Sequence, residues 1–186
     1  MSKKALISGI GGQDGSYLAE FLLEKGYQVY GLERTAGSSP RIGHLRERIS
    51  LMSGDVLNEA MVRKAVLESK PDEIYHLASK VESQFGNTND FGFLDDGVKS
   101  AFNFLSAIKK HSSHSRFFYA SSSKVFGRPD VSPQNESTPY WPVSYYGISK
   151  AGATHLVKMY RESDKLFACS GILFNHESSR RDPVFL

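Results

Sequence analysis

The sequence lacks the features that would cross-link it covalently or place it in a membrane. Its one cysteine, Cys169, excludes an internal disulfide, and the apolar run around it predicts a buried core thiol. No apolar stretch approaches the roughly 20 residues of a membrane-spanning helix, and the sequence does not start with a pattern typical of a signal peptide. We therefore expect a cytoplasmic protein with no membrane partner.

Excess charge of one sign is also scarce. There are 23 Lys and Arg residues and 20 Asp and Glu residues, which gives a net charge of +3 with His neutral. The basic residues are scattered rather than clustered, so we expect no nucleic-acid partner, whereas a small anionic nucleotide is compatible with this charge. The composition, with 40% hydrophobic and 23% charged residues, is that of an ordinary globular domain.

The 186 residues suffice for one domain, or for one domain with part of a second. Short apolar runs predict strands, and apolar residues at helical spacing predict the helices between them. We expect strands over residues 3–7, 28–32, 49–52, 73–78, 116–120 and 166–173, and helices over 16–25, from Asn58 to Pro71, 93–110 and 144–162, with a short helix near 44–48. This alternation predicts an α/β fold, a doubly wound parallel sheet with its ligand at the carboxyl ends of the strands.

Three glycines lie between the first expected strand and the first expected helix. Gly9, Gly12 and Gly15 are spaced three apart, where the chain must turn sharply and approach a ligand closely. The free N–H groups of the following helix would then face a pyrophosphate, which the helix dipole also favours. A tight turn without a ligand has the same glycine pattern, but the strand before it and the helix after it favour an NAD(P)-binding Rossmann fold.

A second motif places chemistry at the same edge of the sheet. Tyr146 and Lys150 are four residues apart on one expected helix, so their side chains are neighbours. An ammonium beside a phenol favours the phenolate, which would let Tyr146 exchange a proton with a hydroxyl group near neutral pH. The run Ser121–Ser123 ends the fifth expected strand, and a hydroxyl there would share that proton; alone, this run would indicate only a turn.

These three motifs, in this order, resemble the extended short-chain dehydrogenase/reductases that act on nucleotide sugars. The stretches 9–18, 71–78 and 171–178 are most similar to the GDP-mannose 4,6-dehydratase family, and the resemblance extends from about residue 5 to residue 181. That family oxidises C4 of the sugar, removes water across C5 and C6, and returns the hydride to C6.

The resemblance implies roles for individual residues. Tyr146 would be the acid/base, Lys150 would tune it and bind the nicotinamide ribose, and Ser122 would occupy the catalytic Ser/Thr position. The implied cofactor contacts are Gly9, Gly12, Gln13, Asp14, Gly15, Arg34, Asp55 and Val56 (near the adenine), Leu77, Ala78 (near the nicotinamide ribose), Tyr146 and Lys150. Ser123 and Asn175 would contact a GDP-sugar substrate, and no metal ligands are implied.

The resemblance also implies an organisation. Residues 1–175 would form the Rossmann domain and residues 176–186 the start of a truncated substrate-binding part, because family members continue for roughly as long again. We expect a homo-oligomer, a dimer or a tetramer, paired through the two long helices.

Some positions depart from the family pattern. The family's glutamate that takes the C5 proton is Lys124 here, which is an ammonium near pH 7. The loop over residues 79–83 also differs, and Thr35 replaces the second arginine of a pair after the second strand. Dehydratase activity is therefore in question. The alternatives are a nucleotide-sugar 4-ketoreductase or epimerase, which needs no C5 base, and a non-catalytic dinucleotide-binding module.

The residues after the second strand give conflicting indications about the cofactor. Glu33 lies where an acidic side chain would bond the ribose hydroxyls of NAD. Arg34 lies beside it, where a guanidinium would grip the 2′-phosphate of NADP. We predict NADP, with NAD as the alternative, because Arg34 is the residue that matches the family pattern.

Overall fold

Parallel strands alternate with helices along the chain, as the sequence pattern predicts. The computed structural model describes residues 2–79 and 92–181. The strands are β1 (Lys4–Ser8), β2 (Gln28–Glu33), β3 (Ile49–Ser53), β4 (Glu73–His76), β5 (Arg116–Ser122) and β6 (Ala168–Leu173). The α-helices are α1 (Gln13–Glu24), α2 (Glu59–Ser69), α3 (Gly92–His111) and α4 (Tyr145–Ser163), and short 3-10 turns form η1 (Pro40–Leu45) and η3 (Ser123–Val125).

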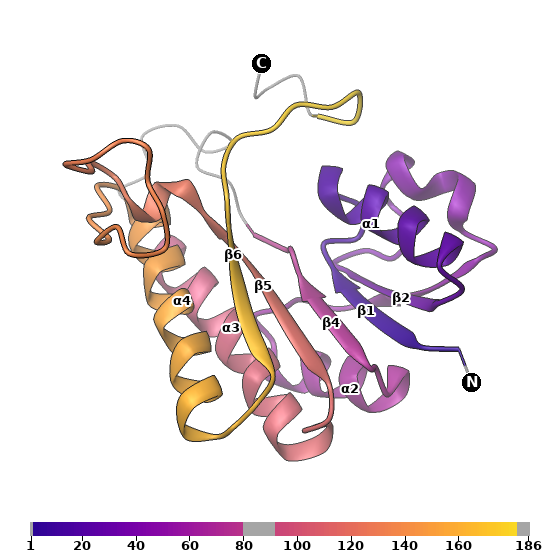
Figure 1. Ribbon diagram of the computed structural model, residues 1–186. Coiled ribbons are helices and arrows are strands. Elements are labelled where there is room, and N and C mark those ends of the chain that lie inside the picture. The colour runs from indigo at the N-terminus through magenta and orange to yellow at the C-terminus, as the bar shows by residue number, and fades with distance from the viewer. Residues whose placement is uncertain (1, 80–91, 182–186) are drawn as a thin grey trace.

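The six strands form one parallel sheet in the order β3-β2-β1-β4-β5-β6. The order reverses between β1 and β4, which is the switch point where a doubly wound sheet opens a crevice for its ligand. The prediction of a doubly wound Rossmann fold is confirmed (Figure 1). The site is therefore expected above the carboxyl ends of β1, β2, β4 and β5.

The two faces of the sheet carry different helices. Alternate residues of each strand point to opposite faces, so Leu6 packs toward the core shared with α2, α3 and α4, while Ala5 and Ile7 pack toward α1 and η1. The larger core contains Phe104, Phe117 and Tyr119, each almost fully buried. Figure 1 shows α3 and α4 side by side on one face and α1 on the other.

Helices α2 and α4 each begin directly after a polar N-cap residue. Asn58 caps α2 as predicted, because its side chain accepts a hydrogen bond from the Met61 amide at 3.2 Å. Ser144 caps α4 in the same way, accepting from the Gly147 amide at 3.1 Å. Helix α1 begins at Gln13, earlier than the predicted residue 16, since the helix continues directly out of the glycine turn.

Other boundaries also differ from the prediction. The short helix expected near 44–48 is the 3-10 turn η1, which begins earlier because Ser39 accepts a hydrogen bond from the Arg41 amide and Pro40 fixes its start. Strand β4 ends at His76 rather than residue 78. Residues 80–83 of the loop that departs from the family pattern lie outside the described residues.

The prediction that Cys169 is buried is wrong. Cys169 is exposed on β6, which is an edge strand. The neighbouring residue Ala168 points into the core beneath α4, so Cys169 must point to the opposite face. In the described part of the chain, the main contacts of α1 with the sheet are with β1 and β2, at a distance from β6 in the strand order. The apolar run around Cys169 therefore indicates a strand but does not show that both of its faces are covered. Among the described helices, none is long and apolar enough to cross a membrane.

Candidate active site

The turn after β1 can exist only because it contains glycine. Gly9 has φ +74°, and a Cβ there would lie 2.8 Å from the Ala78 amide nitrogen. A Cβ on Gly15 would lie 2.3 Å from the Gly9 carbonyl oxygen. The turn is closed by a 2.9 Å hydrogen bond from the Gly12 amide to that same oxygen. The first turn of α1, which has no side-chain cap at Gly12, therefore opens directly onto the crevice.

This crevice consists of two adjoining cavities. The larger, of about 820 Å³, lies against the ends of β2 and β3, and the smaller, of about 370 Å³, lies between the glycine turn, β5 and α4. Predicted cofactor residues line both. The larger cavity includes Gly9, Gly12, Arg34, Asp55, Val56 and Ala78, and the smaller includes Gly9, Gly12, Gln13, Asp14, Gly15, Leu77, Tyr146 and Lys150. The structure thus brings every predicted cofactor residue to one continuous edge of the sheet.

The predicted catalytic pair lies on the first turns of α4. Lys150 is 4% exposed, its Nζ donates a 2.7 Å hydrogen bond to the Ala120 carbonyl of β5, and it lies 5.5 Å from the centre of the Tyr146 ring. Burial lowers the pKa of Lys150 to about 7. A lysine that is fixed and buried beside a tyrosine at a cavity wall is an arrangement typical of proton-transfer sites.

The three serines at the end of β5 differ in their contacts, although Ser121 and Ser122 both line the smaller cavity. Ser122 lines the smaller cavity together with Tyr146, and its Oγ accepts a hydrogen bond from the Lys124 amide at 3.3 Å. Ser121 is buried and bonds Thr154 of α4 through Oγ at 2.7 Å. Ser123, a predicted substrate contact, starts η3 and lines neither cavity. The side chain of Lys124 is exposed, and it too lines neither cavity.

A buried histidine supports the floor of the site. His76, at the end of β4, bridges Ser8 Oγ of β1 at 2.7 Å and Ser100 Oγ of α3 at 2.9 Å. Burial, aided by the positive charge of Lys150, lowers the pKa of His76 to about 3. A neutral imidazole has one donor and one acceptor, which suits two hydroxyl partners. Sequence reasoning gave His76 no role, because a lone histidine in a strand carries no signal of its partners.

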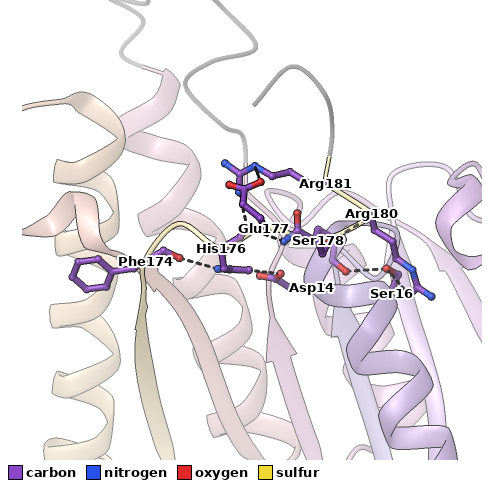
Figure 2. Close-up of polar contacts among 9 residues, drawn as sticks. Asp14, Ser16, Phe174, His176, Glu177, Ser178, Arg180 and Arg181 are labelled. Carbon is purple, nitrogen blue, oxygen red and sulfur yellow. Dashed lines mark hydrogen bonds and ion pairs between the residues drawn. The ribbon is translucent and has the colours of Figure 1, made fainter. Parts of the chain in front are cut away.

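The segment after β6 crosses over the carboxyl edge and packs on α1 (Figure 2). His176 lies 2.7 Å from Asp14, and Gln13 donates a hydrogen bond to the His176 carbonyl at 3.1 Å. Arg180 reaches further along the helix, donating to Ser16 Oγ at 3.1 Å and pairing with Glu20 at 2.5 Å. Residues 174–181 therefore form one wall of the smaller cavity, which includes Asn175, the other predicted substrate contact.

Sequence reasoning missed four basic side chains of the smaller cavity. Arg41, His176, Arg180 and Arg181 all line the smaller cavity, and the first also lines the larger one. Arg41 comes from η1 and donates from Nε to the Arg180 carbonyl at 2.8 Å, joining segments 139 residues apart. No local pattern connects residues that far apart, so only the fold could reveal them. Within the described ranges, no three His, Cys, Asp or Glu side chains gather as metal ligands would.

These features fit a nicotinamide dinucleotide. The glycine turn leaves room for a ligand where side chains would collide, and the start of α1 offers unpaired N–H groups to a pyrophosphate. From this turn the crevice extends into the larger cavity on one side and into the smaller cavity on the other. The adenosine half would occupy the larger cavity, beside Asp55 and Val56. The nicotinamide half would occupy the smaller cavity, beside Tyr146 and Lys150.

A family model described as GDP-mannose 4,6 dehydratase matches residues 6–186. The chain belongs to this family. The GDP-mannose 4,6-dehydratase of Vibrio cholerae is 39% identical over 197 residues, which cover 100% of this chain and 53% of that protein. The human GDP-mannose 4,6 dehydratase is 42% identical over 196 residues, which cover 98% of this chain and 52% of that protein. The chain thus spans about half the length of the GDP-mannose 4,6-dehydratases it matches.

Solved structures agree on the fold. The dTDP-glucose 4,6-dehydratase of Bacillus anthracis, solved in complex with NAD, superposes with a TM-score of 0.81 at 19% identity. The match covers 98% of this chain and 58% of that one. At this identity the likeness establishes the shared fold alone, and the family assignment rests on the sequence match.

Proposed function

We propose that this chain is the dinucleotide-binding part of a GDP-mannose 4,6-dehydratase-like enzyme that acts on a GDP sugar. The observation that carries the proposal is the pairing of Tyr146 with buried Lys150 at the wall of a cavity shared with the glycine turn. Residues 1–175 would form the Rossmann domain, and residues from 176 would begin the substrate-binding part. The cofactor would be a nicotinamide dinucleotide, for which the sequence predicts NADP through Arg34.

The residues of the smaller cavity would carry out the oxidation of C4. Tyr146, as phenolate, would take the proton of the C4 hydroxyl, with Ser122 hydrogen-bonded to the same oxygen. Lys150 would stabilise the phenolate and hold the nicotinamide ribose. The glycine turn, Tyr146 and Lys150 would hold the dinucleotide, which would supply hydride transfer from C4 and to C6. Asn175 would hold the sugar, and so would Ser123 after a change of position, since it does not line the cavity.

The elimination of water is the step this chain supports least. It needs a base that takes the proton from C5 while the C6 hydroxyl leaves as water. By the resemblance, Lys124 stands where the family has a glutamate, and a lysine offers no carboxylate to take that proton. We propose slow C4 oxidation and little dehydration. The same observation favours a 4-ketoreductase or epimerase as the second candidate, because those reactions need Tyr146 and Lys150 but no C5 base. The third candidate is a dinucleotide-binding module without turnover.

Incubation with GDP-mannose and either dinucleotide separates these candidates. Absorbance of the reduced nicotinamide reports C4 oxidation, and mass spectrometry reports loss of water from the sugar. We expect slow cofactor reduction that Tyr146→Phe abolishes. Loss of water from the sugar is expected only after Lys124→Glu in a protein that also has a substrate-binding half, with residue 124 turned toward the sugar, since it lines neither cavity here. Dehydration by the unmodified chain at about 1–10 s⁻¹, an ordinary enzymatic rate, would contradict the role assigned to position 124. Dinucleotide binding without any reduction would favour the non-catalytic module.

We propose a homo-oligomer, a dimer or a tetramer, assembled through α3 and α4. These helices lie side by side and expose large apolar residues, namely Val98, Phe102, Ile148 and Met159. Apolar side chains at 37–47% exposure on two adjacent helices would be covered if a second copy packed against them. Light scattering should give at least twice the mass of 20.7 kDa, and Phe102→Glu should shift the protein toward the monomer.

A further inference from the structure

The carboxylate of Glu33 is fixed at the carboxyl end of β2. Its Oε2 accepts a 2.9 Å hydrogen bond from the Gly37 amide, in a turn where Gly37 has φ +72°. Arg46 also bonds the Gly37 carbonyl, so the turn is held from both sides. Glu33 is partly buried, whereas the following residue, Arg34, is exposed. The acidic side chain is therefore the better positioned of the two.

This carboxylate also lies against the glycine turn. A Cβ on Gly11 would be only 2.1 Å from Glu33 Oε1 and 2.5 Å from the Cβ of Ser39. Ser39 in turn donates from Oγ to the Gly11 carbonyl at 2.7 Å. The missing side chain at Gly11 is what lets Glu33 reach the loop. Glu33 thus forms the wall of the larger cavity between the phosphate-binding turn and the predicted adenine contacts, Asp55 and Val56.

The ribose of a bound adenosine lies between its phosphates and its base, and so would face Glu33. A ribose 2′-hydroxyl donates a hydrogen bond to a carboxylate, whereas a 2′-phosphate, with a charge of about −1.5 to −2, is repelled by it. To offset that repulsion, Arg34 would have to fold back from solvent, or Arg41, which also lines the larger cavity, would have to turn toward the phosphate. The sequence-based expectation of NADP weighed Glu33 against Arg34 and chose Arg34 because it matches the family pattern. The side-chain geometry adds that the Glu33 carboxylate is held in place.

We infer that Glu33 sets the cofactor preference of this chain and that the preferred cofactor is NAD. The inference rests on the proposed dinucleotide site, and it departs from the NADP that Arg34 suggests. It also gives Gly11 a function distinct from that of Gly9 and Gly15, since Gly11 makes room for the selecting side chain rather than for the turn itself.

Calorimetric titration of the purified chain with NAD and with NADP tests the inference. We expect the unmodified protein to bind NAD at least about tenfold more tightly than NADP. Glu33→Gln should bring the two affinities within about threefold, mainly by strengthening NADP binding. Glutamine retains an oxygen that accepts the Gly37 amide, so the turn is preserved. Glu24→Gln removes the same charge from an exposed position that lines neither cavity, and it should leave both affinities unchanged.

The outcomes separate the inference from the proposed function. Tighter binding of NADP by the unmodified protein, or an unchanged affinity ratio in a folded Glu33→Gln protein, would overturn the inference and leave the dinucleotide site intact. A folded protein that binds neither nucleotide would overturn both. Circular dichroism of each variant establishes that it is folded.

Discussion

His176 Nε2 lies 2.7 Å from Asp14 Oδ1, so an imidazole in the segment after β6 faces a carboxylate in the first turn of α1. The other ring nitrogen, Nδ1, lies 2.8 Å from the Phe174 carbonyl oxygen. Both neighbours are hydrogen-bond acceptors, and only the imidazolium offers a donor to each. The Asp14 carboxylate, followed by the Phe174 carbonyl, accordingly raises the pKa of His176.

The packing of residues 174–181 on α1 should therefore weaken as the pH rises. A histidine whose pKa is raised by folding contributes its full stabilisation below its ordinary value of about 6.5 and loses it as pH rises through the higher folded value. Hydrogen exchange, corrected for intrinsic rates, should show greater protection of residues 174–181 at pH 6 than at pH 8. Asp14→Asn should remove this difference. Asp130→Asn, in an exposed loop, is the matched control, and equal protection at both pH values in the unmodified chain would refute the expectation.

Gly15→Ala should destabilise the protein by about 1–3 kcal/mol, the range of an overpacked core. The new Cβ would lie 2.3 Å from the Gly9 carbonyl oxygen and 2.7 Å from the Ile10 Cα, and backbone atoms cannot move aside without opening the turn. Gly43→Ala is the control, because a Cβ on Gly43 meets nothing within 4 Å. Urea unfolding measures both. A Gly15→Ala protein within 0.5 kcal/mol of the unmodified one would show that the turn relaxes freely.

Stability should fall on acidification because of His76. Folding lowers the pKa of His76 to about 3, so below its ordinary value the unfolded chain binds a proton that the folded chain does not. Stability should then decline from about pH 6.5 toward pH 4, with a limiting slope of about 1.4 kcal/mol per pH unit. His76→Asn should flatten this slope, whereas the exposed His114→Asn should keep it. If both variants keep the slope, other groups dominate acid unfolding.

Lys150 should make stability rise with pH above neutrality. Burial lowers its pKa to about 7, so between pH 7 and its unfolded value of about 10.4 the unfolded chain binds the extra proton and stability increases with pH. Lys150→Met should remove that rise between pH 7 and pH 9 and should be more stable than the parent at pH 7. Lys158→Met changes an exposed residue of the same helix and should keep the parent's profile. A parent protein with no rise would mean that Lys150 stays protonated when folded.

The sequence could predict whatever depends on local pattern. Strand and helix alternation predicted the sheet, and the Asn58 cap and the glycine turn were identified from their residue types alone. Tyr146 and Lys150 were found because a four-residue spacing on a helix specifies a contact. The burial of Cys169 was predicted wrongly because an edge strand and a covered strand share the same apolar pattern.

The rest of the site depends on contacts between distant segments. The bond from Arg41 to the Arg180 carbonyl and the bridge from His76 to Ser8 and Ser100 join residues that no window of sequence contains. The orientation of Glu33 depends likewise on the Gly37 amide and on the empty space at Gly11. The sequence shows that Glu33 and Arg34 are adjacent, but only the side-chain geometry shows which of the two is positioned toward the expected ribose.

The contact between η3 and α4 fixes the backbone at position 124 but leaves its side chain exposed. A Cβ on Gly147 would lie 2.6 Å from the Lys124 carbonyl oxygen, so the backbone of position 124 is seated directly against the helix that carries Tyr146. Lys124 itself is exposed. We therefore expect that the residue at 124 can be exchanged, carboxylate for ammonium or the reverse, without displacing Tyr146. In the proposed mechanism, a single replacement at position 124 would therefore separate the elimination of water from oxidation and reduction while the scaffold stays the same.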